Sequence, residues 1–130
     1  MIAATCLAAL IFFEARGESL EGQIAVGEVA INRMESPRWP NDICAVTQQR
    51  KQFSYTHDGL SDNPEKHINN SIDAEAFEVA KIIARELLTE GKMIGLPSTH
   101  YHTVDVAPYW SHIFQRDGRI GRHYFYTDTK

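Results

Sequence analysis

The sequence has no uninterrupted hydrophobic run long enough to cross a membrane, and it has no excess of positive charge. Its most apolar stretch, residues 2–13, is shorter than the roughly 20 residues that a transmembrane helix needs. That stretch also lacks the basic start and the small-residue cleavage site of a secretory signal, so we expect it to form core. A net charge of −4 argues against nucleic acid and anionic membranes as partners.

Cysteine is scarce, and no segment is repeated or of low complexity. Cys6 and Cys44 show no metal-ligand spacing, and they can form one disulfide or remain two buried thiols. The chain length suits one domain, residues 1–130, around a single core. A content of 43% hydrophobic and 23% charged residues is typical of a globular protein.

Apolar periodicity and turn signals predict a mostly helical α+β fold with a small antiparallel sheet in the C-terminal part. The expected helices span residues 2–14, 19–36, 41–49 and 73–90, and the expected strands span residues 99–103 and 123–127. The predicted apolar faces consist of Leu20, Ile24, Ile31 and Met34 in the second helix, and of Ile72, Ala76, Val79, Ala80, Ile83 and Leu87 in the last helix. Between these helices, residues 50–70 form a long polar and irregular segment, and such segments are often functional.

Glu14 is the most informative candidate residue, because it ends an apolar helix just before Gly17. Apolar neighbours and the negative end of the helix dipole both raise the pKa of a carboxyl group and favour its protonated form. A protonated carboxylic acid in a cleft is what a glycosidase uses to protonate a leaving oxygen. The alternative is a structural ion pair between Glu14 and a base such as Arg16.

Other polar residues leave further alternatives open. Glu28 lies on or beside the apolar face of its helix, where it is either a buried functional acid or the ion-pair partner of Arg33. Asp58 can act as the second carboxylate of a hydrolase, although Asp58-Gly59 is more typical of a turn. The histidines His100, His102, His112 and His123 invite a zinc amidase hypothesis, but their spacing is a weak signal. We therefore expect no metal and no other cofactor.

Several sequence blocks resemble the SleB-type cell-wall hydrolases, a family that includes spore-cortex-lytic enzymes and phage endolysins. The blocks occur in family order and cover nearly the whole chain. They are residues 13–18 (FEARGE), 22–29 (GQIAVGEV), 32–33 (NR), 39–41 (WPN), 43–44 (IC), 52–54 (QFS), 99–102 (THYH), 108–110 (PYW) and 120–126 (IGRHYFY).

This resemblance implies a lysozyme-like fold that acts on the glycan strands of peptidoglycan, with Glu14 as the catalytic acid. The substrate-binding residues that it implies are Gln52, Phe53, Ser54, Tyr101, His102, Tyr109 and Trp110. It also favours a disulfide between Cys6 and Cys44, at positions where relatives often carry cysteines.

The expected reaction is that of a lytic transglycosylase, which leaves 1,6-anhydro-MurNAc ends at the MurNAc–GlcNAc bond. The alternatives are a muramidase-type hydrolase that uses water and, more remotely, a non-catalytic glycan-binding module. Because no export signal and no wall-binding domain are recognisable, we expect a monomeric phage endolysin. It would be made in the cytoplasm and released to the cell wall by a separate holin-like protein.

Overall fold

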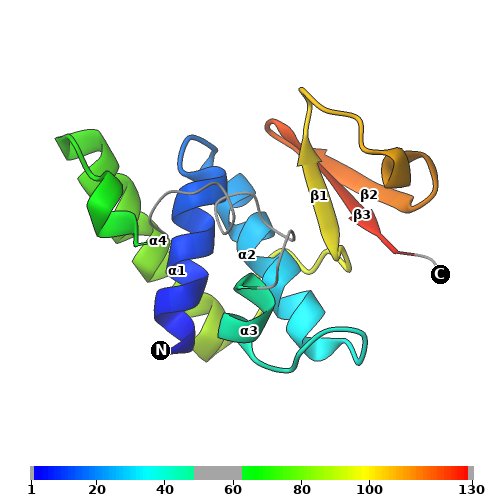
Figure 1. Ribbon diagram of the computed structural model, residues 1–130, viewed down its shortest axis with the longest axis horizontal. Coiled ribbons are helices and arrows are strands. Elements are labelled where there is room, and N and C mark those ends of the chain that lie inside the picture. The colour runs from blue at the N-terminus through cyan, green and yellow to red at the C-terminus, as the bar shows by residue number, and fades with distance from the viewer. Residues whose placement is uncertain (1, 49–62, 129–130) are drawn as a thin grey trace.

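A computed structural model describes residues 2–48 and 63–128, and it shows a group of helices beside a small sheet (Figure 1). The helices are α1 (Ala3–Ala15), α2 (Leu20–Glu35), α3 (Ile43–Thr47) and α4 (Ser71–Glu90), with the short 3₁₀ helices η2 (Pro64–His67) and η3 (Tyr109–His112). The strands are β1 (His100–Thr103), β2 (Gln115–Ile120) and β3 (His123–Thr127). This arrangement confirms the predicted helical α+β class.

Helix α1 lies at the centre of the helical part, and α2, α3 and α4 pack around it (Figure 1). Its buried residues run almost without interruption from Cys6 to Phe12, which is typical of a helix surrounded by protein on all sides. Gly27 of α2 permits close packing here. A Cβ atom at Gly27 would lie 2.7 Å from Leu87 Cδ1 and 3.1 Å from Ile11 Cδ1, so a larger residue would separate α2 from α1 and α4.

Side-chain caps define where the helices begin. The Ser19 hydroxyl accepts a hydrogen bond from Gly22 N, and Asp42 and Asn70 cap α3 and α4 in the same way. Cys6 of α1 and Cys44 of α3 form a disulfide with a Cα–Cα distance of 5.2 Å, which decides between the two alternatives for the cysteines. None of the helices in the described part of the chain is long and apolar enough to span a membrane.

Two apolar residues do not lie where their spacing predicted. Ile72 is 77% exposed and Leu20 is 60% exposed, although both were expected on buried faces. The fully buried residues of α4 lie between Ala80 and Leu87. Because an α-helix turns by about 100° per residue, Ile72 lies within roughly 20° of Ile83 on the same face, but it is in the first turn of α4, before the part of the helix that is buried. Leu20 is the first residue of α2, where the helix has only begun.

The sheet is antiparallel with the strand order β1-β3-β2. The two predicted strands are confirmed, but the sequence did not predict β2, whose residues are mostly polar or charged. The register pairs Tyr101 with Phe125 and His102 with Tyr124. Tyr101 and Phe125 pack against the helical core and define the inner face of the sheet, so His102 and Tyr124 lie on the outer face.

Candidate active site

Glu14 is the last but one residue of α1, and its side chain is half-buried. Burial raises the pKa of the Glu14 carboxyl group, and the nearby Tyr101 side chain opposes this shift without cancelling it. The last turn of α1 carries no basic residue, and the C-terminal end of a helix dipole also disfavours a carboxylate. Glu14 is therefore an acid that retains its proton to a higher pH than an ordinary glutamate.

Arg16 does not neutralise Glu14, which excludes an ion pair between these two residues. The guanidinium of Arg16 lies over the Phe12 ring, 4.4 Å from its centroid, and Arg16 Nη1 is 3.9 Å from Asp73 Oδ1. Among the residues that the structure describes, Glu14 has no ion-pair partner. The carboxyl group is thus left with burial and Tyr101 as its main influences.

Tyr101 comes from β1, and its ring is fixed between the sheet and the helices. It lies edge-on to His123, with ring centroids 5.2 Å apart, and 6.0 Å from the Phe125 ring. Burial lowers the pKa of His123, and the nearby Glu18 carboxylate opposes that shift. The neutral, buried ring of His123 therefore packs against the Tyr101 ring. The phenol is presented to Glu14 by a rigid strand rather than by a loop.

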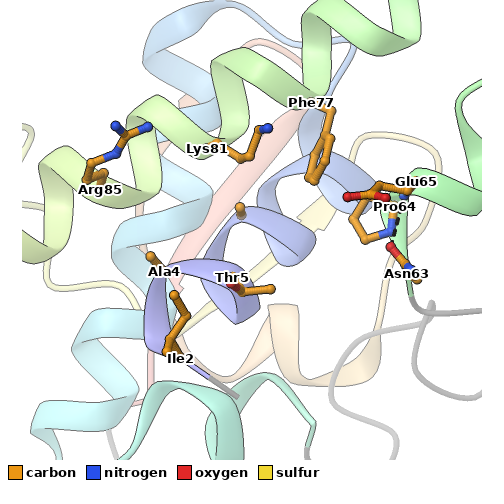
Figure 2. Close-up of a pocket in the computed structure, with 10 residues that line it drawn as sticks. Ile2, Ala4, Thr5, Asn63, Pro64, Glu65, Phe77, Lys81 and Arg85 are labelled. Atoms are coloured by element: carbon orange, nitrogen blue, oxygen red, sulfur yellow. Dashed lines mark hydrogen bonds between the residues drawn. The ribbon is translucent and has the colours of Figure 1, made fainter.

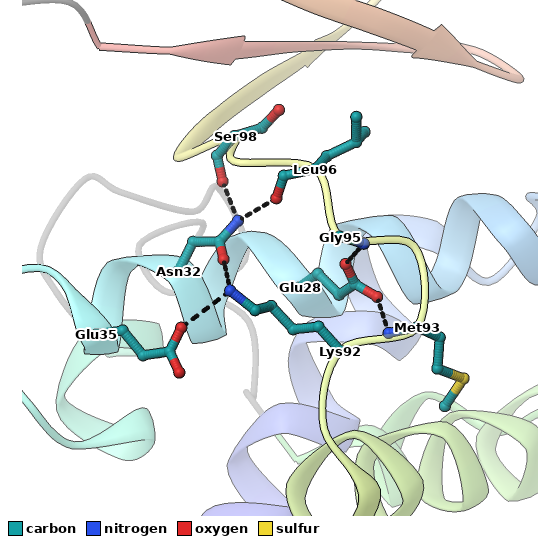
Figure 3. Close-up of polar contacts among 8 residues, drawn as sticks. All are labelled: Glu28, Asn32, Glu35, Lys92, Met93, Gly95, Leu96 and Ser98. Carbon is teal, nitrogen blue, oxygen red and sulfur yellow. Dashed lines mark hydrogen bonds and ion pairs between the residues drawn. The ribbon is translucent and has the colours of Figure 1, made fainter.

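Helix α2 holds the chain segment that leads into β1 (Figure 3). The Glu28 carboxylate is buried and accepts hydrogen bonds from Met93 N and Ile94 N, both at 2.7 Å, and from Gly95 N at 2.8 Å. One turn later, the Asn32 amide donates to the carbonyl oxygens of residues 96 and 98, each at 2.8 Å. These contacts fix the direction in which the chain enters β1 and so help to position Tyr101.

The contacts of Glu28 match neither of the two roles that the sequence predicted for it. Its carboxylate is 1% exposed and is used by three backbone N–H groups, so it is a structural acceptor rather than a functional acid. The neighbouring Arg33 donates from Nε to Thr99 O at 2.6 Å, and burial lowers its pKa to about 10. Glu28, Asn32 and Arg33 of α2 thus share one task, which is to attach the start of β1.

Glu18 attaches the other end of the sheet to the helices. Its Oε1 atom accepts a hydrogen bond from Arg122 N at 2.9 Å, in the turn between β2 and β3. Gly121 in this turn has φ of +57°, and a Cβ atom there would lie 2.3 Å from Glu18 Oε1. The connection directly after α1 is therefore fixed to the sheet at a position that only glycine accommodates. The sequence analysis did not predict this contact, although Gly121 and Glu18 both lie in the quoted blocks.

The predicted substrate-binding residues are distributed over two faces of the sheet. Tyr101 lies beside Glu14, whereas His102 and Trp110 lie on the outer face, with ring centroids 5.6 Å apart. Tyr109 is next to Trp110 in η3 and is 75% exposed. Gln52, Phe53 and Ser54 lie outside the described residues, as does Asp58. The structure thus brings Tyr101 to Glu14 and places the others apart, and their role in binding stays a prediction.

On the outer face, a chain of hydrogen bonds defines the tautomer of His102. Because the Thr103 carbonyl oxygen can only accept, His102 Nδ1, at 2.7 Å, is its donor. His102 Nε2 then accepts from the Tyr126 hydroxyl at 2.9 Å, and that hydroxyl accepts from Arg116. His102 is therefore hydrogen-bonded through both ring nitrogens, which fixes the orientation of its ring.

The histidines do not converge. His100 and His102 face the outer side of the sheet, whereas His123 pairs with Thr103 on the inner side. Within residues 2–48 and 63–128, no group of three or more His, Cys, Asp or Glu side chains is placed to hold a metal ion. The zinc amidase hypothesis therefore has no support from the geometry of the described histidines.

A hollow between α1, η2 and α4 lies away from Glu14 (Figure 2). Thr5 and Phe77 line it together with Lys81, and Thr5 lies nine residues before Glu14 on α1. With a rise of 1.5 Å per residue, this separation is roughly 14 Å along the helix. The hollow is therefore distinct from the Glu14 site.

Comparison with solved structures identifies proteins of similar fold. The catalytic domain of the germination-specific lytic transglycosylase SleB from Bacillus anthracis superposes with a TM-score of 0.70 at 25% identity. The match covers 96% of this chain and 93% of that domain. The SleB catalytic domain from Bacillus cereus gives a TM-score of 0.65, also at 25% identity, over 96% of this chain and 90% of that one. The lysozyme-like fold expected from the sequence is thus confirmed.

The sequence is also similar to curated proteins. The spore cortex-lytic enzyme of Bacillus subtilis (strain 168) is 42% identical over 53 residues, which are 41% of this chain and 17% of that protein. The spore cortex-lytic enzyme of Halalkalibacterium halodurans is 38% identical over 53 residues, 41% of this chain and 16% of that protein. The matched part is thus less than a fifth of either relative. The profile of the cell wall hydrolase family matches residues 17–126, beginning just after Glu14. Because this match covers most of the sequence, the chain belongs to the cell wall hydrolase family.

Proposed function

We propose that the chain cleaves the glycan strands of peptidoglycan at the MurNAc–GlcNAc bond, with Glu14 as the general acid. The observation that carries the proposal is a half-buried carboxyl group with a raised pKa, beside the Tyr101 side chain and without an ion-pair partner among the described residues. Membership of the cell wall hydrolase family and the similarity to a domain described as a lytic transglycosylase support it.

In the proposed reaction, protonated Glu14 donates its proton to the glycosidic oxygen as the bond to C1 of MurNAc breaks. Positive charge develops at C1, and the GlcNAc hydroxyl leaves. The Glu14 carboxylate then accepts the proton of the 6-hydroxyl of the same MurNAc, whose oxygen attacks C1 and closes a 1,6-anhydro ring. The proton balance returns Glu14 to its starting state, and no water is consumed.

The surroundings of Glu14 suit both halves of this cycle. Burial favours the protonated acid that begins the reaction, and the neighbouring Tyr101 side chain favours the carboxylate that forms in its first step. A group that alternates between the two forms benefits from opposing influences that keep both accessible. The burial of Glu28 and the three backbone N–H groups that it accepts support a mechanism in which Glu14 acts without it.

The test compares Glu14→Gln with Glu86→Gln, an exposed glutamate of α4 that undergoes the same chemical change. Release of soluble muropeptides from purified peptidoglycan is measured after circular dichroism has shown that both variants are folded. We expect Glu14→Gln to lose about 10²–10⁴-fold of the rate, the usual contribution of a general acid, and Glu86→Gln to keep it. Normal release by folded Glu14→Gln would reject the assignment. No release by the unmodified chain would instead favour a glycan-binding module.

The biological setting that we propose is that of a phage endolysin, as expected from the sequence, acting on the wall as a monomer after release by a holin-like protein. Lysis on co-expression with a holin, but not on expression alone, would support this setting. Lysis without a holin would contradict it.

A further inference from the structure

Two arginines lie together on the outer face of the sheet because β2 contains a bulge. Arg116 and Arg119 are three residues apart, so in a regular strand they would point to opposite faces. The register shifts between Arg116 and Gly118, and Arg116 pairs with Tyr126 while Arg119 pairs with Tyr124. Since these partners are two residues apart on β3, the bulge brings both arginines to one face.

Both guanidinium groups are held in place. Each lies over the Tyr124 ring, with Arg116 at 4.2 Å and Arg119 at 5.3 Å from its centroid. Arg116 donates from Nε and Nη2 to the Tyr126 hydroxyl, and Arg119 donates from Nε to Gly121 O at 2.9 Å. A guanidinium has five N–H donors, so each arginine keeps donors that these contacts do not use.

No carboxylate within residues 2–48 and 63–128 forms an ion pair with Arg116 or Arg119. Asp117 lies between them in the sequence, but its carboxylate accepts hydrogen bonds from the Ser98 and Thr127 hydroxyls, both at 2.6 Å. In contrast, Arg122 in the adjoining turn pairs with Asp105. Two like charges beside one ring, in a protein of net charge −4, form a local positive site that an anion would stabilise.

We propose that Arg116 and Arg119 bind a carboxylate of the peptide stems of peptidoglycan. This inference rests on the proposed function, since it names a second part of the same wall substrate. A planar guanidinium group can form a bidentate pair of hydrogen bonds with a carboxylate, and stacking on an aromatic ring fixes the orientation of the guanidinium plane. The site lies on the outer face, whereas Glu14 contacts Tyr101 of the inner face. It therefore provides an attachment to the wall that is separate from bond cleavage.

The test uses the Glu14→Gln background, so that the wall stays intact while binding is measured by co-sedimentation. Arg119 is changed, because Arg116 also contacts the Tyr126 hydroxyl that bonds His102. On peptidoglycan freed of phosphate polymers by hydrofluoric acid, we expect Arg119→Gln to weaken binding about three- to tenfold, and Arg119→Glu to weaken it more. Arg85→Gln, an exposed arginine of α4, is the matched control and should bind normally.

A second arm removes the charge of the ligand instead. Amidation of the stem carboxylates with carbodiimide and ammonia should weaken binding by a similar factor and abolish the difference caused by Arg119→Gln. Equal binding by Arg119→Gln and its parent on unmodified stems would overturn the proposal, as would a difference that survives amidation. A difference seen only while phosphate polymers are present would overturn it in favour of a phosphate ligand. Muropeptide release by the chain with Glu14 intact is scored separately, so the proposed function fails or stands independently of this site.

Discussion

The substitution Glu28→Gln tests whether the start of β1 is held by the helices as described. In the structure, Oε2 of Glu28 accepts from Met93 N and Ile94 N, and Oε1 accepts from Gly95 N. Glutamine keeps one oxygen but replaces the other with an amide N–H₂ group. If the remaining oxygen accepts the first two bonds, the amide donor faces the Gly95 N–H donor, and that buried N–H loses its partner.

The expected cost follows from these contacts. Loss of one hydrogen bond to a charged group costs about 1.5–3 kcal/mol, and weakening the other two to neutral bonds adds roughly 1 kcal/mol. The free energy of unfolding should therefore fall by about 2.5–4 kcal/mol. For 130 residues, 1 kcal/mol corresponds to roughly 4 °C in Tm, so the expected decrease in Tm is about 10–15 °C.

Thermal unfolding followed by circular dichroism measures this decrease, with Glu86→Gln as the exposed control of identical chemistry. The control should unfold within about 2 °C of the parent, because surface substitutions rarely exceed 0.5 kcal/mol. A Glu28→Gln protein as stable as the control would refute the structural role. If that stable protein were also inactive, Glu28 rather than Glu14 would become the candidate acid.

Three further predictions concern other contacts. Replacing Cys6 and Cys44 by serine should lower the free energy of unfolding by about 4 kcal/mol, because the disulfide closes a loop of 38 residues. A denaturant midpoint of the parent chain that does not change when the disulfide is reduced would contradict this. Gly121→Ala should lower the free energy of unfolding by about 1–2 kcal/mol or more, because alanine is strained at φ +57° and its Cβ displaces Glu18. Gly118→Ala is the control, because a Cβ atom there has open space. Equal urea midpoints for the two variants would exclude the Glu18 contact. Because the pKa of Glu14 is raised in the folded protein, protonated Glu14 contributes to the free energy of unfolding below pH 4.5, the ordinary pKa. This contribution is lost as the pH rises through the raised pKa of the folded state. The Tm of Glu14→Gln relative to the parent should therefore increase from pH 4 to pH 8, and a constant difference would disprove the shift.

The sequence predicted the elements whose stability is local. Apolar periodicity, turn signals and β-forming residues placed the four α-helices and strands β1 and β3 close to their observed positions. Strand β2 was missed because its sequence is polar, and it exists through pairing with β3 and through arginines that cover tyrosine rings. Its stability comes from partners that no local pattern reveals.

The candidate site was also predictable only where the signal is local in the sequence. Glu14 was identified from its position at the end of an apolar helix, and the structure adds Tyr101 as its partner. The role of Glu28 could not be derived, because its three partners lie 65–67 residues away in the sequence. Strand alternation separates Tyr101 from His102, so a block of adjacent residues in the sequence serves two different faces.

Mass spectrometry of the soluble muropeptides released from purified peptidoglycan tests the central claim most directly, with Glu14→Gln as the control. Intramolecular attack by the 6-hydroxyl predicts 1,6-anhydro-muramyl ends, lighter by one water than reducing ends and absent from the Glu14→Gln digest. Reducing muramyl ends released by the unmodified chain would contradict the transglycosylase mechanism and show that water is the nucleophile. Anhydro ends that persist in the Glu14→Gln digest would contradict the role of Glu14 itself.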